Sequence, residues 1–397
     1  MPQVIINPSI RGFLSLTAHP DGCAHNVRRQ IDLAKRRGPG KGLGNVLVIG
    51  SSTGYGLSTL VTTLFGYGAK ALSVCFERPG AGNKAGSAGW YNLAEVHRLA
   101  KAQGRQVETL NGDAFSTAIK QQAMAALKER FGKIDQLIYS IASPRRTDPT
   151  TGTTYNSVLK PVDAAFASKS INLDSGQIKS VTINPASEAE IRSTIKVMGG
   201  EDWAYWIEAL RNADLLAPGF RTVAYSYMGP RFTSGIYRTG TIGHAKEHLE
   251  ATGRTLDEKL RDGQGGGAWV SINKALVTQA SSAIPVVPLY ISLLYRVMKE
   301  RGSHEGTIEQ VLRLYRSHLA PARTPMLDDR SRIRLDNREL DDEVQTEVMD
   351  LWEQMTSENF EEISDFAGFR REFRGLFGFD IEGIDYQKPT EVELPLV

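Results

Sequence analysis

One local pattern limits the fold of this chain more than any other: a short strand, a glycine-rich turn and a helix in direct succession. Residues 45–49 form a β-branched run that leads into Gly50, Gly54 and Gly56, and an apolar segment with helical spacing follows to residue 65. This order opens a nucleotide-binding βαβ unit. The spacing differs from GxGxxG, so the turn alone leaves a purely structural role open.

The same alternation continues beyond this unit, which favours the binding interpretation. Short apolar runs alternate with stretches of helical pattern, as expected for a parallel sheet with helices on both faces. The sequence therefore predicts an α/β protein with an enlarged Rossmann fold and a doubly wound parallel sheet. After the first strand, further strands are expected at residues 69–77, 106–110, 134–140, 221–227 and 268–272.

We expect one enlarged Rossmann-type domain in the 397 residues, because the predicted strands lie on both sides of a polar stretch. That stretch is expected to hold a hairpin turning at 174–177 and a helix that starts in a capping box at Ser187 and Glu190. The predicted parts are an N-terminal extension (1–44), a nucleotide-binding core (45–146 and 217–282), a covering insertion (147–216) and a mainly helical C-terminal part (283–397).

Composition excludes several classes of protein. Lys and Arg number 47 against 45 Asp and Glu, so no global charge favours nucleic acid or an acidic membrane. Two cysteines, Cys23 and Cys75, form no disulfide framework and are predicted to be packed thiols in a reducing setting. The N-terminus lacks a secretory pattern, and the apolar run 283–294 is too short to span a bilayer. We therefore expect a cytoplasmic protein without stable membrane association, with this run as a buried helix.

Polar residues at the ends of the predicted strands point to a dinucleotide site. Glu77 ends the second strand, where a carboxylate accepts hydrogen bonds from the adenosine ribose and repels a 2′-phosphate, so the sequence predicts NADH over NADPH. A solvent-facing glutamate is the alternative. Asp113 and Ala114 follow the third strand, where adenine would lie. Ile141 and Ala142 follow the fourth, near the nicotinamide ribose.

Two tyrosine–lysine pairs compete for the role of proton donor and its partner. Tyr295 and Lys299 are four residues apart, which places them on one helix face. Tyr237 and Lys246 are nine apart, so they can act together only if the helix starts between them, and Thr241 is expected as its N-cap. The second pair directly follows the fifth strand, so we assign catalysis to it and read the first as a helix-surface pair.

At these positions the chain resembles the trans-2-enoyl-CoA reductase family of the short-chain dehydrogenase/reductase superfamily. That family includes the long bacterial enoyl-acyl-carrier-protein reductases. The resemblance spans essentially the whole chain, and the Tyr-x8-Lys spacing of residues 237–246 is its most specific mark. The other matching segments are residues 18–23, 50–56, 226–230 and 276–282.

The resemblance implies NADH-dependent reduction of the C2–C3 double bond of trans-2-enoyl thioesters in fatty acid biosynthesis. It implies that Tyr237 donates to the thioester enolate, that Lys246 holds the nicotinamide ribose and assists Tyr237, and that Tyr227 contacts the thioester carbonyl. The residues implied to line NADH are Gly50, Ser51, Ser52, Thr53, Gly54, Tyr55, Phe76, Glu77, Asp113, Ala114, Ile141, Ala142, Lys246, Leu276, Val277 and Thr278.

Two other functions stay open: a short-chain carbonyl reductase acting on 3-ketoacyl substrates, and a non-catalytic NAD-binding sensor. The extended Tyr-x8-Lys spacing argues against the first, and the retained pair argues against the second. The expected partners are an enoyl thioester and, transiently, acyl carrier protein; no nucleic acid, no metal and a monomeric state are expected. A basic run between Arg28 and Lys41 is read as a solvated helix face, with the carrier or CoA phosphates as the alternative.

Overall fold

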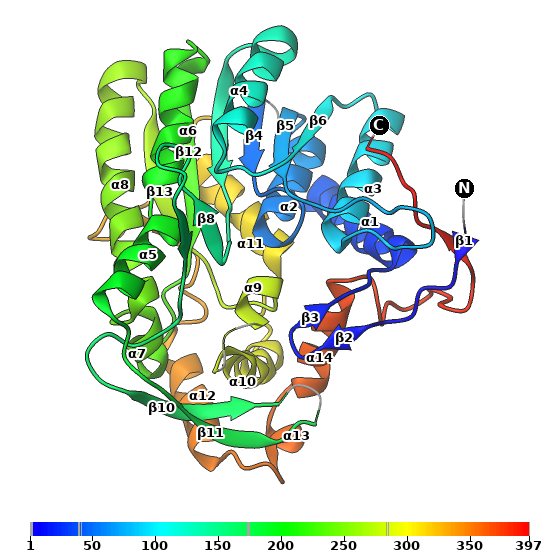
Figure 1. The fold of residues 1–397 in the computed structure, drawn as a ribbon, viewed down its shortest axis with the longest axis vertical. Coiled ribbons are helices and arrows are strands. Elements are labelled where there is room, and N and C mark those ends of the chain that lie inside the picture. The colour runs from blue at the N-terminus through cyan, green and yellow to red at the C-terminus, as the bar shows by residue number, and fades with distance from the viewer. Residues whose placement is uncertain are drawn as a thin grey trace.

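A single parallel sheet of seven strands organises the upper half of the molecule (Figure 1). The structure, a computed structural model, describes residues 3–38, 40, 42–172, 175–282, 284 and 286–396. All strands of this sheet pair in parallel, which confirms the predicted class. In spatial order they are β14 (Arg332–Arg334), β13 (Gly267–Ile272), β12 (Leu216–Ser226), β7 (Ile134–Tyr139), β4 (Asn45–Ile49), β5 (Lys70–Cys75) and β6 (Val107–Asn111).

The chain order reverses between β4 and β7, because β5 and β6 extend the sheet to one side and β12 to β14 to the other. In sheets of this kind ligands bind at the carboxyl ends of the strands, beside the reversal point. The residues after β4 and β7 therefore mark the centre of the expected site.

Helices cover both faces of the sheet. One face carries α1 (Pro20–Arg37), α2 (Gly54–Val61), α3 (Ala88–Ala102) and α11 (Thr307–Leu314), whose apolar residues form one core cluster. The other face carries α4 (Thr117–Ala126), α6 (Glu201–Asn212) and α8 (Thr241–Gln264). Trp203 and Trp206 of α6 are fully buried, and Trp203 Nε1 donates to Thr222 Oγ1 at 2.8 Å. Helix α6 thus packs on the sheet between β7 and β12.

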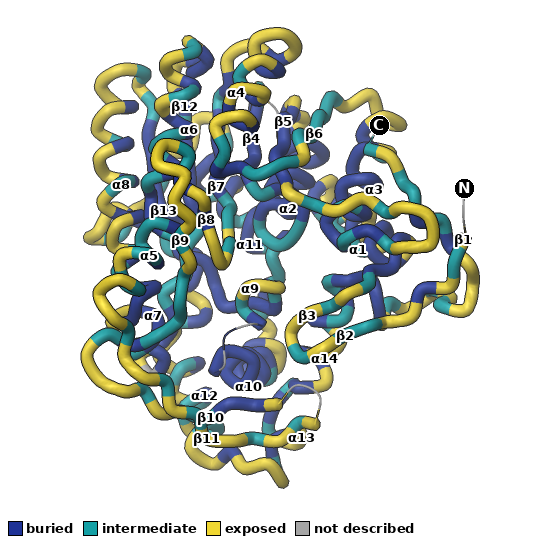
Figure 2. The backbone as a smooth tube through the Cα atoms, viewed as in Figure 1, coloured by how far each residue is buried: buried dark blue, intermediate teal, exposed yellow. Residues whose placement is uncertain are grey.

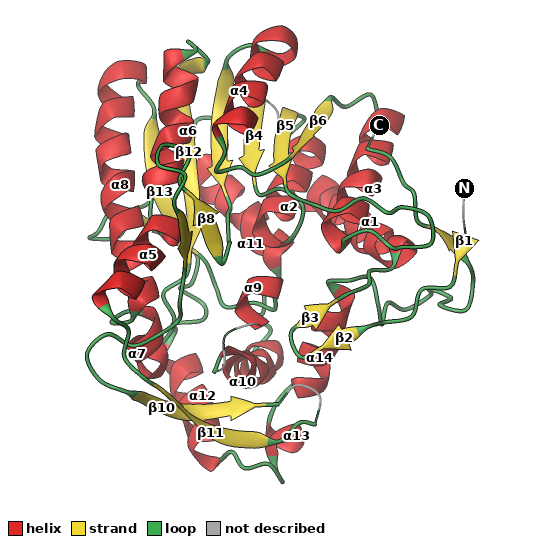
Figure 3. Cartoon of the chain, viewed as in Figure 1, coloured by secondary structure: helices red, strands yellow, loops and turns green. Residues whose placement is uncertain are grey.

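The polar stretch before α6 forms two hairpins and one helix, seen below and beside the sheet in Figure 3. Helix α5 (Glu188–Met198) starts in the predicted capping box of Ser187 and Glu190. The second hairpin turns where predicted, although Asp174 of the predicted turn and Leu173 before it lie outside the described residues. The hairpin strands are β8 (Arg145–Thr147) with β9 (Thr154–Asn156), and β10 (Phe166–Ile171) with β11 (Ile178–Ile183).

The C-terminal part forms a second helical layer below the sheet, around helix α10 (Val287–Glu300), which is buried along most of its length (Figure 2). The predicted buried helix is confirmed, although Ala283 and Pro285 of the apolar run lie outside the described residues. Helix α10 is surrounded by α9 (Gln279–Ser282), α12 (Asp342–Gln354), α13 (Phe360–Ile363) and α14 (Phe366–Gly375).

The two ends of the chain pair with each other in a small sheet of their own. Strand β1 (Gln3–Val4) pairs with β15 (Thr390–Glu391), and a small hairpin of β2 (Ile10–Arg11) and β3 (Leu14–Ser15) follows β1. Strand β14 was not predicted. It comes from the C-terminal part of the chain and adds an edge strand to the sheet. None of the described helices is both long and apolar enough to cross a bilayer.

Candidate active site

The glycine turn after β4 is packed so tightly that side chains are excluded. Gly50 has φ +82°, and a Cβ there would lie 2.1 Å from the carbonyl oxygen of Ser140. A Cβ on Gly56 would lie 1.8 Å from the oxygen of Gly50. Thr53, the N-cap of α2, makes no side-chain cap hydrogen bond, so the first amides of the helix stay available to an anion. The turn therefore fits a pyrophosphate.

Glu77 is fixed in place at the end of β5. Its Oε1 accepts from Ser52 Oγ at 2.6 Å, which links it to the glycine turn. Asn111, at the end of β6, holds the backbone of Glu77 by accepting from its amide and donating to its carbonyl, both at 2.8 Å. The carboxylate is therefore a preorganised acceptor rather than a freely solvated side chain.

The other residues predicted for the adenosine end follow the same edge of the sheet. Phe76 is 78% exposed, so its ring offers an apolar face to solvent. Asp113 lies just beyond β6 and accepts from the amide of Phe115 at 2.9 Å, and Ala114 beside it is buried. Ile141 follows β7 and approaches Gly50, whose added Cβ would lie 3.3 Å from its Cδ1. Ala142 is the next residue. The residues after β5, β6 and β7 therefore lie along the same edge of the sheet.

The loop after β13 joins the glycine turn from the opposite side. Tyr55 of α2 donates its hydroxyl to the carbonyl of Lys274 at 3.0 Å. A Cβ on Gly54 would lie 3.9 Å from Cγ2 of Thr278. Ser281 Oγ donates to the carbonyl of Leu276 at 2.6 Å and accepts from the amide of Thr278 at 2.9 Å, which fixes residues 276–278 beside the turn.

Tyr227, Tyr237 and Lys246 form one cluster at the carboxyl end of β12. Tyr237 ends the short helix α7 (Ser234–Tyr237), and Lys246 lies inside α8, as the break between them predicted. The rings of Tyr227 and Tyr237 meet edge to face with centroids 4.9 Å apart. The Lys246 Nζ lies 4.8 Å from the ring centroid of Tyr237 and 5.3 Å from that of Tyr227. The Lys246 ammonium therefore lies within cation–π distance of both tyrosine rings.

Burial controls the electrostatics of this cluster. Burial lowers the pKa of Lys246 to about 7, and the nearby charge of Glu250 opposes that shift. Burial raises the pKa of Tyr237 well above its ordinary value, so its hydroxyl stays protonated and able to donate. Among the described residues, the Lys246 ammonium has no hydrogen-bond or ion-pair partner. The cluster therefore offers one hydroxyl donor and one free cation at the strand ends.

Two local expectations about these pairs were wrong. Helix α8 has Gly240 as its N-cap instead of Thr241, because the Thr241 hydroxyl donates to the carbonyl of Val158 in the adjoining segment. Tyr295 is fully buried instead of lying at the helix surface. Its hydroxyl accepts from the amide of Val277 at 3.1 Å, so it supports the 276–278 loop, while the Lys299 Nζ lies 4.7 Å from its ring.

Three residues at the site had no clear signal in the sequence. Asn111 holds Glu77, as described above. Glu339 and Lys274 are both buried beneath the tyrosine cluster, and Glu339 accepts the hydroxyl of Tyr227 at 2.9 Å. Glu339 lies between two elements, where an acidic residue is ordinarily predicted to be exposed. Lys274 directly follows a buried strand, and this position is the one signal that could have marked it as a site residue.

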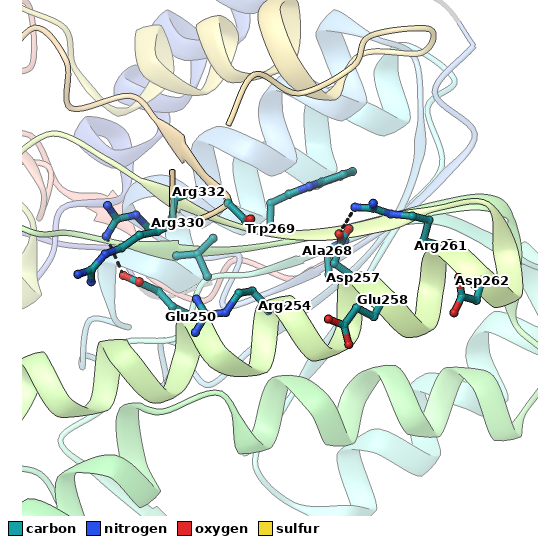
Figure 4. A pocket seen from close by; sticks show the side chains of 13 residues that line it. Glu250, Arg254, Asp257, Glu258, Arg261, Asp262, Ala268, Trp269, Arg330 and Arg332 are labelled. Carbon is teal, nitrogen blue, oxygen red and sulfur yellow. Dashed lines mark hydrogen bonds and ion pairs between the residues drawn. The ribbon is translucent and has the colours of Figure 1, made fainter. Parts of the chain in front are cut away.

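A separate hollow of about 370 Å³ lies between α8 and β13, beside residues 330–332 at the start of β14 (Figure 4). Four of its charged residues form two ion pairs: Arg332 with Glu250 at 3.2 Å, and Arg261 with Asp257. None of the residues predicted for cofactor or substrate lines this hollow. The candidate site is therefore the strand-end cluster and not this surface feature.

Comparisons with known proteins match the chain over nearly its full length. Residues 84–320 match the family model for the trans-2-enoyl-CoA reductase catalytic region, and residues 5–82 match the NAD(P)H binding domain of trans-2-enoyl-CoA reductase. The chain is 50% identical over 387 residues to an enoyl-[acyl-carrier-protein] reductase [NADH] of Flavobacterium johnsoniae, covering 98% of each chain. It is 48% identical over 391 residues to a trans-2-enoyl-CoA reductase [NADH] of Ruminiclostridium cellulolyticum, also covering 98% of each.

Solved structures show the same arrangement of the whole chain. The trans-2-enoyl-CoA reductase of Clostridium acetobutulicum, solved in complex with NADH, superposes with a TM-score of 0.95 at 40% identity, covering 98% of each chain. The trans-2-enoyl-CoA reductase of Treponema denticola, solved in complex with NAD, superposes with a TM-score of 0.93 at 45% identity and the same coverage.

A third family model, described as an enoyl reductase FAD binding domain, matches residues 327–390. The N-termini of its two longer helices do not fit a flavin pyrophosphate. Asp341 caps α12 by accepting from the amides of Glu343 and Val344, and Asp365 caps α14 by accepting from Gly368. These carboxylates occupy the helix amides that an anion would need and carry the wrong charge. No flavin chemistry is assigned to this segment.

Proposed function

Since this chain belongs to the trans-2-enoyl-CoA reductase family, we propose that its strand-end cluster reduces the C2–C3 double bond of trans-2-enoyl thioesters. The protein is an NADH-dependent enoyl-thioester reductase of fatty acid biosynthesis. The observation that carries the assignment of the site is the contact of Tyr227, Tyr237 and Lys246 at the carboxyl end of β12.

Charge development on the substrate determines what the residues do. NADH supplies a hydride, which adds to C3 of the enoyl thioester and leaves negative charge on the thioester oxygen as an enolate. Tyr237 stays protonated at neutral pH and donates a hydrogen bond to that enolate. Its proton then passes to C2, which gives the saturated thioester, and Tyr237 takes a proton back from solvent. Preorganised donors of this kind supply much of the rate in related chemistry.

The remaining residues position the two reactants. Lys246 holds the nicotinamide ribose hydroxyls and stabilises the ring of Tyr237. Tyr227 contacts the thioester carbonyl. The glycine turn, residues 50–55, takes the pyrophosphate, and residues 276–278 take the nicotinamide end. Phe76, Glu77, Asp113 and Ala114 take the adenosine end, while Ile141 and Ala142 line the cofactor between them.

One assay separates this function from its alternatives. We expect NADH oxidation, followed at 340 nm, with crotonyl-CoA and none with acetoacetyl-CoA. Rapid oxidation with acetoacetyl-CoA instead would assign the site to carbonyl reduction. Binding of NADH without oxidation in either case would assign it to a sensor.

Glu77 should determine the choice of cofactor. Replacing Glu77 by Ala removes the carboxylate that repels a 2′-phosphate and leaves Arg78 beside it, so we expect the NADPH:NADH ratio of kcat/KM to rise at least about tenfold, worth roughly 1.4 kcal/mol. Steady-state kinetics with both cofactors measure this ratio. Glu129→Ala, an exposed acid on another element, serves as the matched control. An unchanged ratio in Glu77→Ala would remove Glu77 from cofactor selection.

The proposal extends to the carrier, the assembly and the location of the enzyme. Acyl carrier protein is the proposed transient partner, because Arg29, Arg36 and Arg37 form an exposed basic face on α1; Lys41 lies outside the described residues. Paired kinetics with crotonyl-CoA and crotonyl carrier protein test this.

We also propose that one enlarged domain works as a monomer in the cytoplasm. The pairing of β1 with β15 and the entry of β14 into the sheet support one domain, and the buried thiols fit a reducing setting.

A further inference from the structure

A buried carboxyl group lies directly behind the substrate tyrosine. Glu339, in the segment between β14 and α12, is fully buried. Its Oε1 accepts from the hydroxyls of Tyr227 at 2.9 Å and Tyr290 at 2.7 Å, and its Oε2 accepts from the amide of Ala275 at 2.6 Å. Three segments far apart in the sequence therefore meet at one carboxyl group that the mechanism above leaves without a role.

Counting protons shows why this group matters for Tyr227. A tyrosine hydroxyl carries one proton and can donate to one partner at a time. When Glu339 is ionised, Tyr227 gives that proton to Glu339 and presents only lone pairs to a thioester oxygen, which is itself an acceptor. Tyr290 is different, because its oxygen accepts from Gln345 Nε2 at 3.2 Å while its own proton goes to Glu339.

Burial favours the neutral form of Glu339, whereas Lys274 and the donors Tyr227, Tyr290 and Ala275 favour its charged form; on balance its pKa is raised. Burial raises its pKa, and Lys274 opposes that shift from the loop after β13. The Lys274 Nζ donates to the carbonyl of Ala275 at 2.9 Å, and burial lowers the pKa of Lys274 to about 8. The titratable or charged groups that face this centre are Tyr55 of α2, Tyr227 after β12, Tyr237 of α7, Lys274 after β13, Tyr290 of α10, and Asp336 after β14.

We propose that Glu339 is a positioning residue that works as a neutral carboxylic acid, donating its proton to the oxygen of Tyr227 so that the Tyr227 hydroxyl can donate to the thioester carbonyl. This proton stays on Glu339 throughout turnover. Compared with the ionised form of Glu339, only the direction of the hydrogen bond between Glu339 and Tyr227 is reversed. Tyr227 then joins Tyr237 as a second donor to the enolate oxygen. This inference rests on the proposed function.

Glu339→Gln imitates the neutral acid. The amide of Ala275 requires an acceptor, so the glutamine oxygen faces Ala275 and its NH₂ group donates to Tyr227 as the neutral acid does. The NH₂ group cannot accept the proton of Tyr290, so the Tyr290 hydroxyl must turn to another acceptor. In the wild type we expect kcat for crotonyl-CoA, at saturating NADH, to fall about tenfold per pH unit above the pKa of Glu339. Glu339→Gln should lose this fall and keep a near wild-type kcat at low pH. A separate fall caused by Lys246 should remain in both proteins.

Two further variants make the test decisive. Tyr227→Phe has no hydroxyl to redirect, so its kcat should be lower than that of the wild type below the pKa of Glu339, should approach the wild-type value above that pKa, and should lack the same fall. Glu305→Gln is the matched control, because Glu305 is also buried but pairs with Arg313 at 2.6 Å; it should keep the wild-type profile. Circular dichroism melting and NADH titration confirm that each variant is folded.

Each remaining outcome counts for or against the inference. A folded Glu339→Gln that keeps the wild-type fall, or that is inactive at all pH values, would overturn it. If Glu339→Gln does not fold, Tyr227→Phe decides, and a retained fall in that variant would overturn the inference. A wild-type protein that fails to reduce crotonyl-CoA at any pH would instead refute the proposed function.

Discussion

Replacing Tyr237 by Phe should lower kcat for crotonyl-CoA by about 10²–10³-fold, the loss typical for one preorganised oxyanion donor. The substitution removes only the hydroxyl and keeps the ring, which meets Tyr227 at 4.9 Å and lies under the Lys246 ammonium. The dissociation constant of NADH should stay within about twofold, because no part of the proposed cofactor site is lost. Stopped-flow turnover and fluorescence titration with NADH measure the two quantities.

Tyr205→Phe is a suitable control for this experiment. Tyr205 lies in α6, whose buried tryptophans pack against the sheet, and it contacts Arg146 rather than the strand-end cluster. Its loss should leave kcat unchanged. Near wild-type turnover in Tyr237→Phe would exclude the Tyr237 hydroxyl from the mechanism.

Replacing Lys246 by Met should affect binding and turnover together, which distinguishes it from the tyrosine variant. Methionine fills a similar volume but provides no cation for the two tyrosine rings, or for the ribose hydroxyls that Lys246 is proposed to hold. We expect kcat/KM for NADH to fall by more than about 10²-fold, with a higher dissociation constant for NADH and a lower kcat. Equilibrium titration and steady-state kinetics separate the two contributions.

The pH dependence gives an independent check on Lys246. Because its pKa is lowered to about 7, the ammonium is present below that pH and is lost as the pH rises through it. The part of the activity that depends on this charge should therefore fall above about pH 7 in the wild type and be absent in Lys246→Met. Lys259→Met, an exposed position on the same helix, should change neither the pH profile of the activity nor the affinity for NADH. Unaltered NADH affinity in Lys246→Met would contradict the proposed role of the ammonium.

Much of the fold could be predicted because its signals are local. The strands β4 to β7 are short runs that alternate with helices, β4 is rich in β-branched residues, and the glycine turn follows β4 without a gap. The separation of Tyr237 from Lys246 by a helix start was also readable, since nine residues would place them on opposite faces of one helix. Each of these inferences needs only a short window of sequence.

The features that escaped prediction depend on distant segments. Strand β14 contains only Arg332–Arg334, and two of its three residues are arginines, so its pattern resembles a loop; it becomes a strand by pairing with β13. Glu339 is buried because donors from three separate segments converge on it. Tyr295 is buried because the loop after β13 and the C-terminal helices cover α10. No local pattern contains such information.

The most direct test of the central claim uses NADH that carries deuterium at the transferred C4 position. Crotonyl-CoA is converted to the saturated thioester with this cofactor, and proton and deuterium NMR locate the label in the product. Hydride addition opposite Tyr237 predicts deuterium at C3 of the acyl chain and solvent hydrogen at C2. Deuterium at C1, or a saturated product without deuterium, would contradict the account.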